Sequence, residues 1–161
     1  MTAKNILLTW FMSIGLTLVN VAQADVLSES KPTSNTSAKL HRVVFDVSVN
    51  EVESYKTLLR NVSNLKKTFG ADNVQIEVVA YSKGLDLLLS KDPELVKGVD
   101  SLVTESGVQL AACGVTVKSR NLAASDLPEK AKVVDSGLAE IVRRQEEGWS
   151  YIKLASYPPQ P

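Results

Sequence analysis

The stretch Val108-Gln-Leu-Ala-Ala-Cys113-Gly114-Val-Thr-Val-Lys118-Ser-Arg120 decides how the rest of the chain is interpreted. Its first five residues are a short apolar run of the length expected for a buried strand. Gly114 then lets the backbone turn, so that the following residues can open a helix. The chain's one cysteine therefore lies where a strand ends and a helix begins. In open α/β sheets, ligands bind at this end of the strands.

Two interpretations of Cys113 follow from this position. Unpaired N–H groups and the positive end of a helix dipole would favour the thiolate, which is the nucleophilic form of cysteine. Free cysteine is also common as a small buried packing residue. Lys83 and Lys118 are the candidate cations that could lower the pKa of the thiol, and each also fits a solvated surface charge. The sequence leaves both interpretations open.

Composition limits the classes of partner. The chain has 161 residues with 18 basic and 18 acidic side chains, a formal net charge of +0. This balance offers no basic surface of the kind that binds nucleic acids. One cysteine excludes an internal disulfide, and one cysteine with one histidine cannot supply the four ligands of structural zinc. We therefore expect no metal, no cofactor and no nucleic-acid partner.

Residues 1–24 have the pattern of a secretory signal peptide. Lys4 supplies the positive charge, residues 6–19 are largely apolar, and the segment closes with the small-x-small pattern Ala-Gln-Ala24. The alternative is an uncleaved anchor, but the apolar run is shorter than the ~20 residues of a spanning helix. We expect cleavage after Ala24, export to the periplasm and no membrane contact in the mature protein.

We expect a folded domain over residues 41–155, between a disordered polar linker at 25–40 and an extended Pro-rich tail at 156–161. Runs rich in β-branched residues alternate with helical patterns, which predicts an α/β fold with one five-stranded parallel sheet and helices on both faces. The predicted strands are 41–47, 74–80, 108–113, 130–134 and 150–155, and the predicted helices are 51–69, 85–89, 93–106, 114–120 and 137–147.

Two of these helices begin with recognisable capping patterns. Asn50 followed by Glu53 is a variant of the capping box and predicts the start of the first helix. Asp92 followed by Pro93 predicts the start of the third, with aspartate as the cap and proline at the first helical position.

The candidate site lies at the edge of the sheet where the carboxyl ends of parallel strands meet. Cys113 is the candidate nucleophile there. The chain has no Cys-x-x-Cys motif, Ser119 stands where a phosphate loop would need arginine, and His41 begins the first strand, at the opposite edge. No complete catalytic constellation is therefore predicted, which leans against an enzyme. The candidate ligand-binding residues at the same edge are Ser48, Asn50, Tyr81, Ser82, Lys83, Gly114, Ser136 and Gly137.

Three segments resemble the DsrE/DsrF-like family, a group often labelled intracellular sulfur oxidation proteins. They are Arg42-Val-Val-Phe-Asp-Val-Ser with the helix that follows, Gly107-Val-Gln-Leu-Ala-Ala-Cys113-Gly114, and residues 126–153 with Ser136-Gly-Leu-Ala-Glu-Ile and Gln145-Glu-Glu-Gly-Trp-Ser-Tyr-Ile-Lys153. The resemblance implies a three-layer α/β/α sandwich, assembly into homotrimers or hexamers, and sulfur carried as a persulfide on the cysteine that corresponds to Cys113. Related sequences often have His-Gly where this chain has Tyr81-Ser82.

Three functions stay open at this point. The chain is an exported sulfur-handling protein that carries sulfane sulfur on Cys113 and exchanges it with a donor or acceptor protein. Alternatively, it is a non-catalytic module that holds a small ligand at the strand ends, with Cys113 only packing. The third possibility is an oligomer whose role is assembly with other proteins of the cell envelope.

Overall fold

The computed structural model describes residues 39–156 of the chain. The expectations for the signal peptide, for most of the linker and for the tail after residue 156 lie outside these residues. Within this part the strands are β1 (His41–Val47), β2 (Val74–Ala80), β3 (Gln109–Cys113), β4 (Ala131–Val134) and β5 (Ser150–Lys153). The helices are α1 (Val52–Phe69), α2 (Pro93–Thr104), α3 (Gly114–Ser119) and α4 (Gly137–Glu146), with short 3-10 turns η1 (Ala71–Asn73), η2 (Ser82–Leu87) and η3 (Ala124–Asp126).

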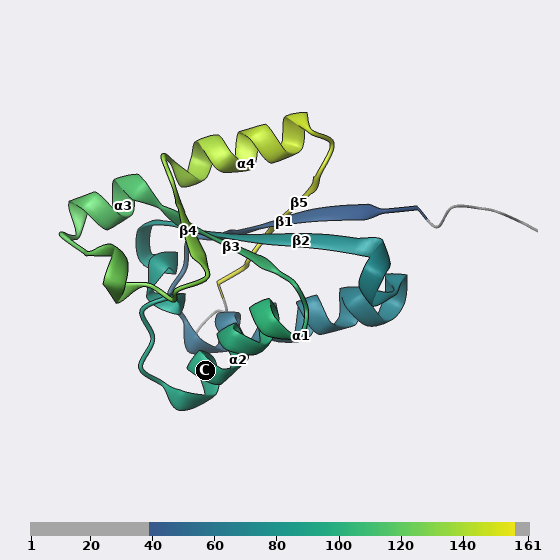
Figure 1. The fold of residues 1–161 in the computed structure, drawn as a ribbon, viewed down its shortest axis with the longest axis horizontal. Coiled ribbons are helices and arrows are strands. Elements are labelled where there is room, and N and C mark those ends of the chain that lie inside the picture. Colours follow the sequence, from purple (N-terminus) through teal and green to yellow (C-terminus); the bar gives the residue numbers. More distant parts are fainter. Residues whose placement is uncertain (1–38, 157–161) are drawn as a thin grey trace, which may run out of the picture. The chain divides into compact units, whose positions relative to one another are not determined.

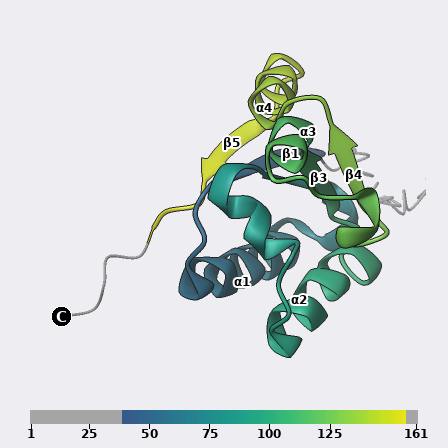
Figure 2. The ribbon, with the colours of Figure 1, turned by 90° about the vertical axis from the view of Figure 1, so that its left-hand side faces the viewer.

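The strands form one sheet in the order β4-β3-β2-β1-β5, and every neighbouring pair is parallel. The chain adds β2, β3 and β4 on one side of β1 and then returns to place β5 on its other side. Figure 2 looks at the strands from their carboxyl ends, with β5 and β4 at the two edges. The predicted five-stranded parallel sheet is confirmed, and the structure adds the strand order.

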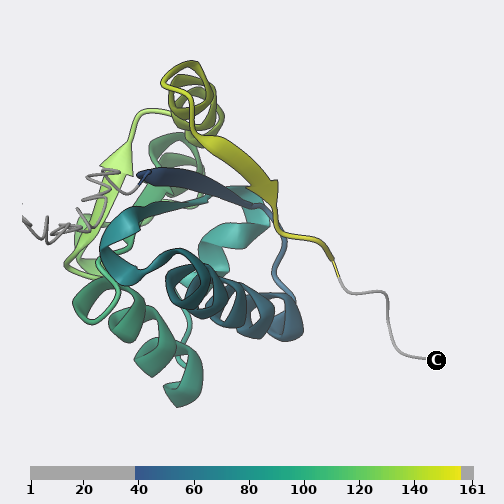
Figure 3. The same ribbon diagram turned by 90° about the vertical axis from the view of Figure 1, so that its right-hand side faces the viewer.

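Helices cover both faces of the sheet. α1 and α2 lie on one face and α4 on the other (Figure 1), and the opposite view shows the same three layers (Figure 3). α3 lies beyond the carboxyl end of β3, because it begins directly after the last residue of that strand. Three layers therefore meet at the edge where Cys113 emerges.

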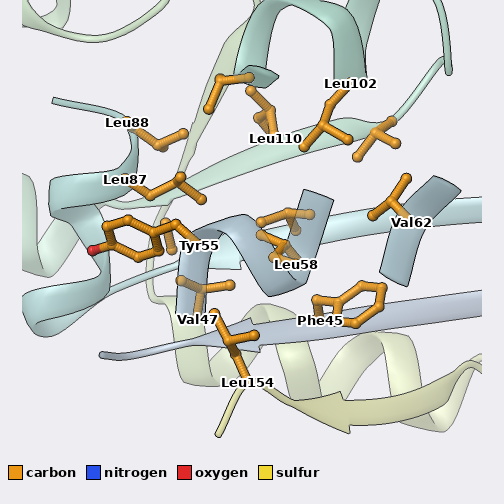
Figure 4. Packing of buried hydrophobic residues seen from close by; sticks show 14 of the residues in the cluster. Phe45, Val47, Tyr55, Leu58, Val62, Leu87, Leu88, Leu102, Leu110 and Leu154 are labelled. Carbon is orange, nitrogen blue, oxygen red and sulfur yellow. The ribbon is translucent and has the colours of Figure 1, made fainter. Parts of the chain in front are cut away.

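The two faces of the sheet have different cores. On the α1 face, Tyr55, Leu58 and Val62 of α1 pack against Phe45 and Val47 of β1 (Figure 4). On the α4 face the apolar cluster is smaller, consisting of Val44, Val79, Ala111, Val134, Ile141 and Trp149. The larger cluster gives the α1 face a continuous apolar interior. The α4 face carries buried polar groups as well, and the candidate site lies on this face.

The Asp92 cap is confirmed. Its carboxylate accepts hydrogen bonds from the N–H groups of Glu94 at 2.8 Å and Leu95 at 3.2 Å, and α2 begins at Pro93. These bonds satisfy two of the backbone donors that every helix leaves free at its start.

Two local expectations are wrong. Asn50 does not cap α1, because the helix begins one residue later than the pattern predicts and Glu51 holds the cap position without a side-chain bond. The Asn50 amide instead donates to Asp86 at 3.4 Å. The predicted helix at 85–89 is the 3-10 segment η2, since the N–H of Gly84 bonds to the carbonyl of Tyr81 three residues earlier. No helix within residues 39–156 has the length and apolar character required to cross a membrane.

Candidate functional site

Cys113 is the last residue of β3 and occupies the cap position of α3. It pairs in register with Val134 of β4, and its side chain faces α4. Gly137, the first residue of α4, lies against it. A Cβ atom added at Gly137 would be 3.2 Å from the Cys113 Cβ and 3.0 Å from the Tyr81 Cβ. The starts of two helices and the Tyr81 side chain therefore enclose the thiol, which is only 5% exposed.

The surroundings of Cys113 favour its ionised form. Burial is the largest single effect on the pKa of Cys113 and raises it, because a buried thiolate loses hydration. The Thr116 hydroxyl and the backbone N–H groups of Gly137, Thr116 and Val115 act in the opposite direction, and the net pKa is lowered. The Thr116 oxygen already accepts the Ser82 N–H at 3.0 Å, so its own hydrogen is available to the sulfur.

The two lysines do not supply this effect. Lys83 and Lys118 are both exposed, and the leading causes of the lowered pKa of Cys113 are hydrogen-bond donors. The expectation that a lysine is the principal partner of the thiolate is therefore wrong. A solvated lysine charge is screened by water, whereas N–H and O–H groups at the thiol act at hydrogen-bond distance.

A second polar cluster lies beside the thiol on the same face of the sheet. The hydroxyls of Tyr81 and Tyr151 both donate to Asp46 Oδ2, at 3.2 and 2.7 Å. Asp46 is 4% exposed, and its Oδ1 has no hydrogen-bond partner among the described residues. The hydrogen bond to Asp46 and then burial raise the pKa of Tyr151 to about 12. These two hydroxyls thus stay protonated and donate to the carboxylate at neutral pH.

Tyr81 connects the Asp46 cluster with Cys113. Burial raises the pKa of Tyr81, the Ser48 hydroxyl opposes this, and the negative charges of Asp46 and Cys113 add to the rise. Its Cβ packs against the place where α4 begins, while its hydroxyl reaches Asp46 on β1. The ring therefore stands between the carboxylate and the thiol.

Two hollows flank the strand end. The first, about 540 Å³, lies between α3 and β4 and has mostly aliphatic walls. The second, about 470 Å³, lies between η2 and α3 and is polar. Both volumes fall in the range that holds small ligands. The first is lined by Gly114, Val115, Val117, Lys118, Ala124, Val133, Val134 and Asp135, and the second by Ser82, Lys83, Asp86, Thr116, Ser119 and Arg120.

The structure brings five of the candidate ligand-binding residues together around Cys113. Tyr81 and Gly137 touch the site directly, and Gly114 follows the cysteine and lines the first hollow. Ser82 is joined to α3 through its N–H bond to Thr116, and the Ser48 hydroxyl acts on Tyr81. These residues come from the ends of β1, β2 and β3 and from the start of α4.

Three candidates have other roles. Asn50 is exposed and donates to Asp86, away from the thiol. Lys83 is exposed at the rim of the second hollow. Ser136 caps α4, because its hydroxyl oxygen accepts the N–H of Ala139 at 3.5 Å. Each lies at the predicted edge, but none is in contact with the sulfur through the bonds described.

Sequence reasoning missed Asp46, Thr116 and Tyr151. Asp46 had a usable signal, because it is a charge inside the apolar run Val-Val-Phe-Asp46-Val of β1, and a buried charge needs partners. Thr116 stands three residues after Cys113, the spacing at which a helix brings side chains onto one face. Nothing local marks Tyr151, since its contact depends on β5 pairing with β1.

The chemistry available at this site is that of one soft nucleophile surrounded by hydrogen-bond donors. Among residues 39–156, no group of three or more His, Cys, Asp or Glu side chains is placed to hold a metal ion. A thiolate held by neutral donors can attack an electrophilic sulfur and later leave as the thiolate again. The arrangement therefore suits reversible reaction at sulfur.

A parallel α/β/α domain with an ionisable cysteine at the end of its third strand is the class of protein that the fold and site define. Residues 43–154 match the DsrE/DsrF-like family, and the chain belongs to this family. The solved structure of MTH1491 from Methanobacterium thermoautotrophicum, a protein of unknown function, is similar, with 39% sequence identity and a TM-score of 0.64. The match covers 70% of this chain and 98% of that one. No curated protein matches the chain.

Proposed function

We propose that this chain is a sulfur-handling protein that carries sulfane sulfur as a persulfide on Cys113. The observation that supports the proposal most directly is the set of donors at the thiol, the Thr116 hydroxyl and three backbone N–H groups, which together lower the pKa of Cys113. The thiolate is the species that attacks sulfane sulfur. Membership of the DsrE/DsrF-like family, which is associated with sulfur relay, supports the same function.

Mass spectrometry of the purified protein after brief exposure to inorganic polysulfide tests this function. We expect the mass of one added sulfur atom, located on the peptide that contains Cys113 and removed by a reducing agent. Cys113→Ser is the matched control, because it keeps the size of the side chain and removes the nucleophile. Sulfur loading that persists in this variant, or a wild-type protein that takes up none, would contradict the proposal.

The proposal includes export. The charge at Lys4, the apolar run and the Ala-Gln-Ala24 pattern support a cleaved signal peptide and a periplasmic mature protein that begins at Asp25. Sequencing of the protein from a periplasmic extract checks this. A chain that starts at Met1 and stays with the membrane fraction would contradict it.

The proposal also includes assembly. Family membership supports a homotrimer or hexamer that exchanges sulfur with a donor or acceptor protein. Light scattering at micromolar concentration measures the mass in solution. A monomer under these conditions would count against assembly and would leave the role of Cys113 untouched.

The burial of Cys113 favours a second candidate function. A thiol that is 5% exposed can be a packing group, and the hollow of about 540 Å³ beside Gly114 has the aliphatic walls of a small-ligand site. In this case the protein is a binding module without covalent chemistry. Native mass spectrometry of the isolated protein would then detect a bound small molecule whose retention is unchanged by Cys113→Ser.

A further inference from the structure

We propose that Tyr81 determines which sulfur donor reaches Cys113, admitting unbranched inorganic polysulfide and excluding organic persulfides, with Asp46 as the positioning residue that holds Tyr81 in place. This inference rests on the proposed function of Cys113 as a sulfur carrier. It adds the chemical class of the donor and the residues that select it.

The first part of the argument is the width of the approach to the thiol. The Tyr81 side chain and Gly137 stand so close to Cys113 that a single added methyl at Gly137 would be 3.0 and 3.2 Å from their Cβ atoms. The thiol is 5% exposed behind them. A polysulfide chain is one atom wide along its whole length, whereas an organic persulfide widens into its carbon skeleton directly behind the two sulfur atoms. Only the former fits an opening of this kind.

The second part is the way in which Tyr81 is fixed at both ends. Its Cβ packs at the start of α4, and its hydroxyl donates to Asp46 at 3.2 Å. Asp46 is itself held from β5 by the Tyr151 hydroxyl at 2.7 Å. A ring anchored at both ends cannot swing aside to widen the opening, so the anchor on β1 sets the size of the donor that enters.

The third part is the unpaired oxygen of Asp46. A buried carboxylate that receives hydrogen bonds on one oxygen alone is an unfavourable arrangement, because its other oxygen loses hydration without a partner. Asp46 therefore contributes less to stability than a fully paired carboxylate would. What it does provide is an acceptor at a fixed point of β1 for the hydroxyl of Tyr81.

The covalent step needs no further reactant. The Cys113 thiolate attacks the protonated terminal sulfur of a hydropolysulfide, forming a new S–S bond. The bond between that sulfur and its neighbour breaks, and the remaining chain leaves with the electron pair as a polysulfide that is shorter by one sulfur. The product is the protonated persulfide on Cys113, and no external oxidant or reductant takes part.

The experiment compares two donors on the purified protein, sodium tetrasulfide and glutathione persulfide. The rate of sulfur loading at Cys113 is followed by mass spectrometry, and each rate is divided by the rate of the same donor with free cysteine. We expect tetrasulfide to exceed glutathione persulfide by at least about tenfold on this corrected scale, the discrimination a steric pocket provides. In Tyr81→Ala, glutathione persulfide should gain about tenfold while tetrasulfide stays within about twofold.

Asp46→Ala tests the positioning role and keeps the inference testable if Tyr81→Ala does not fold. Loss of the anchor should raise the corrected rate of glutathione persulfide severalfold, in the same direction as Tyr81→Ala. General loosening of the structure would raise both rates together, so the ratio of the two donors separates the roles. Tyr55→Phe, which removes a buried tyrosine hydroxyl on the α1 face, is the matched control and should leave the ratio unchanged.

The possible failures are distinguishable. If tetrasulfide does not load wild-type Cys113, the proposed function fails and the inference fails with it. If wild-type protein accepts both donors at equal corrected rates, the inference is overturned while the function stands. A ratio that stays at its wild-type value in both Tyr81→Ala and Asp46→Ala also overturns it, because some other feature would then select the donor.

Discussion

Two carboxylates are buried on the α4 face of the sheet, and the protein compensates them differently. Glu77, in the middle of β2, is 2% exposed and is paired with Arg144 of α4, whose Nη2 donates to Glu77 Oε1 at 3.3 Å. Arg144 also contacts Glu140 and Glu147 and stacks over the Trp149 ring at 4.7 Å. Asp46, at the carboxyl end of β1, receives only the neutral hydroxyls of two tyrosines.

The difference separates a structural role from a functional one. The Glu77 network is an ion-pair network whose charges are matched and whose geometry holds α4 onto the sheet. At the Asp46 cluster a negative charge is kept without a cation, one strand from a thiol that itself tends to ionise. An arrangement that is unfavourable for folding and lies at the ligand-binding edge is the kind found at functional sites.

The largest expected effect comes from breaking the Glu77 network. Arg144→Met leaves Glu77 and Glu140 buried without their cation, and loss of one partner of a buried pair costs about 3–5 kcal/mol. We expect this decrease in the free energy of unfolding, measured by urea denaturation. The alkylation rate of native Cys113 should change little, because the network lies away from the carboxyl edge.

Arg143→Met is the matched control for this prediction. Arg143 pairs with Glu140 from the exposed side of the same helix, and an exposed pair contributes about 0–1 kcal/mol. Equal losses in the two variants would show that burial of the Arg144 network does not matter and would remove the contrast between the clusters.

The next effect concerns Gly137, at the end of α4 that touches the thiol. In Gly137→Ala the new methyl would press against Tyr81 and Cys113 at 3.0 and 3.2 Å, so their side chains must shift. Overpacking of this kind costs about 1–3 kcal/mol of unfolding free energy. We also expect slower alkylation of Cys113 in the native state. Faster alkylation would mean that the methyl opens the site and that close packing at Gly137 does not limit access.

Much of the fold follows from local patterns in the sequence. β2 spans the predicted residues 74–80, and Asp92 caps α2 as predicted, because strand periodicity and an Asp-Pro start are encoded within a few neighbouring residues. The cap at Asn50 fails because a one-residue shift of the helix start moves the side chain outside the cap position. Strand order was not accessible from these patterns, since it depends on which strand pairs with β1 on its free side.

The candidate site was predictable in part. The place of Cys113 follows from one strand ending before one glycine, and Tyr81 and Gly137 follow from the rule that parallel strands end at one edge. The donors at the thiol were not predictable in the same way. Gly137 reaches Cys113 only because the start of α4 packs beside β3, and Tyr151 reaches Asp46 only because β5 returns beside β1.

A smaller effect should distinguish the two carboxylates directly. In Asp46→Asn an amide oxygen still accepts from both tyrosines, so we expect unfolding free energy to change by less than about 1 kcal/mol. Glu77→Gln, the matched control, weakens a charged hydrogen bond to Arg144 and should cost about 1.5–3 kcal/mol. A loss in Asp46→Asn as large as in Glu77→Gln would show that Asp46 is also a structural charge.

The same variant has a spectroscopic signature. The hydrogen bond to Asp46 and burial together raise the pKa of Tyr151 to about 12. Without the negative charge, tyrosinate at this position costs less, so the pKa should fall and ionisation should begin at lower pH. Ultraviolet titration of Asp46→Asn against the wild type measures this change. An unchanged titration curve would mean that the carboxylate does not hold the Tyr151 hydroxyl in solution.

The smallest expected change in stability belongs to Thr116→Val, which tests how the thiolate itself is held. Valine keeps the shape of threonine but lacks the hydroxyl that lowers the pKa of Cys113. The pKa of Cys113 should therefore rise, and because the thiolate is the reacting form, the pH profile of alkylation should move to higher pH. Ser119→Ala removes an exposed hydroxyl from the same helix and should leave the profile unchanged. If Thr116→Val also leaves it unchanged, the backbone N–H groups of Gly137, Thr116 and Val115 hold the thiolate without the side chain. Ionisation would then be set by the starts of the two helices, and the carboxyl edge would need no side-chain donor to keep an anion beside Asp46.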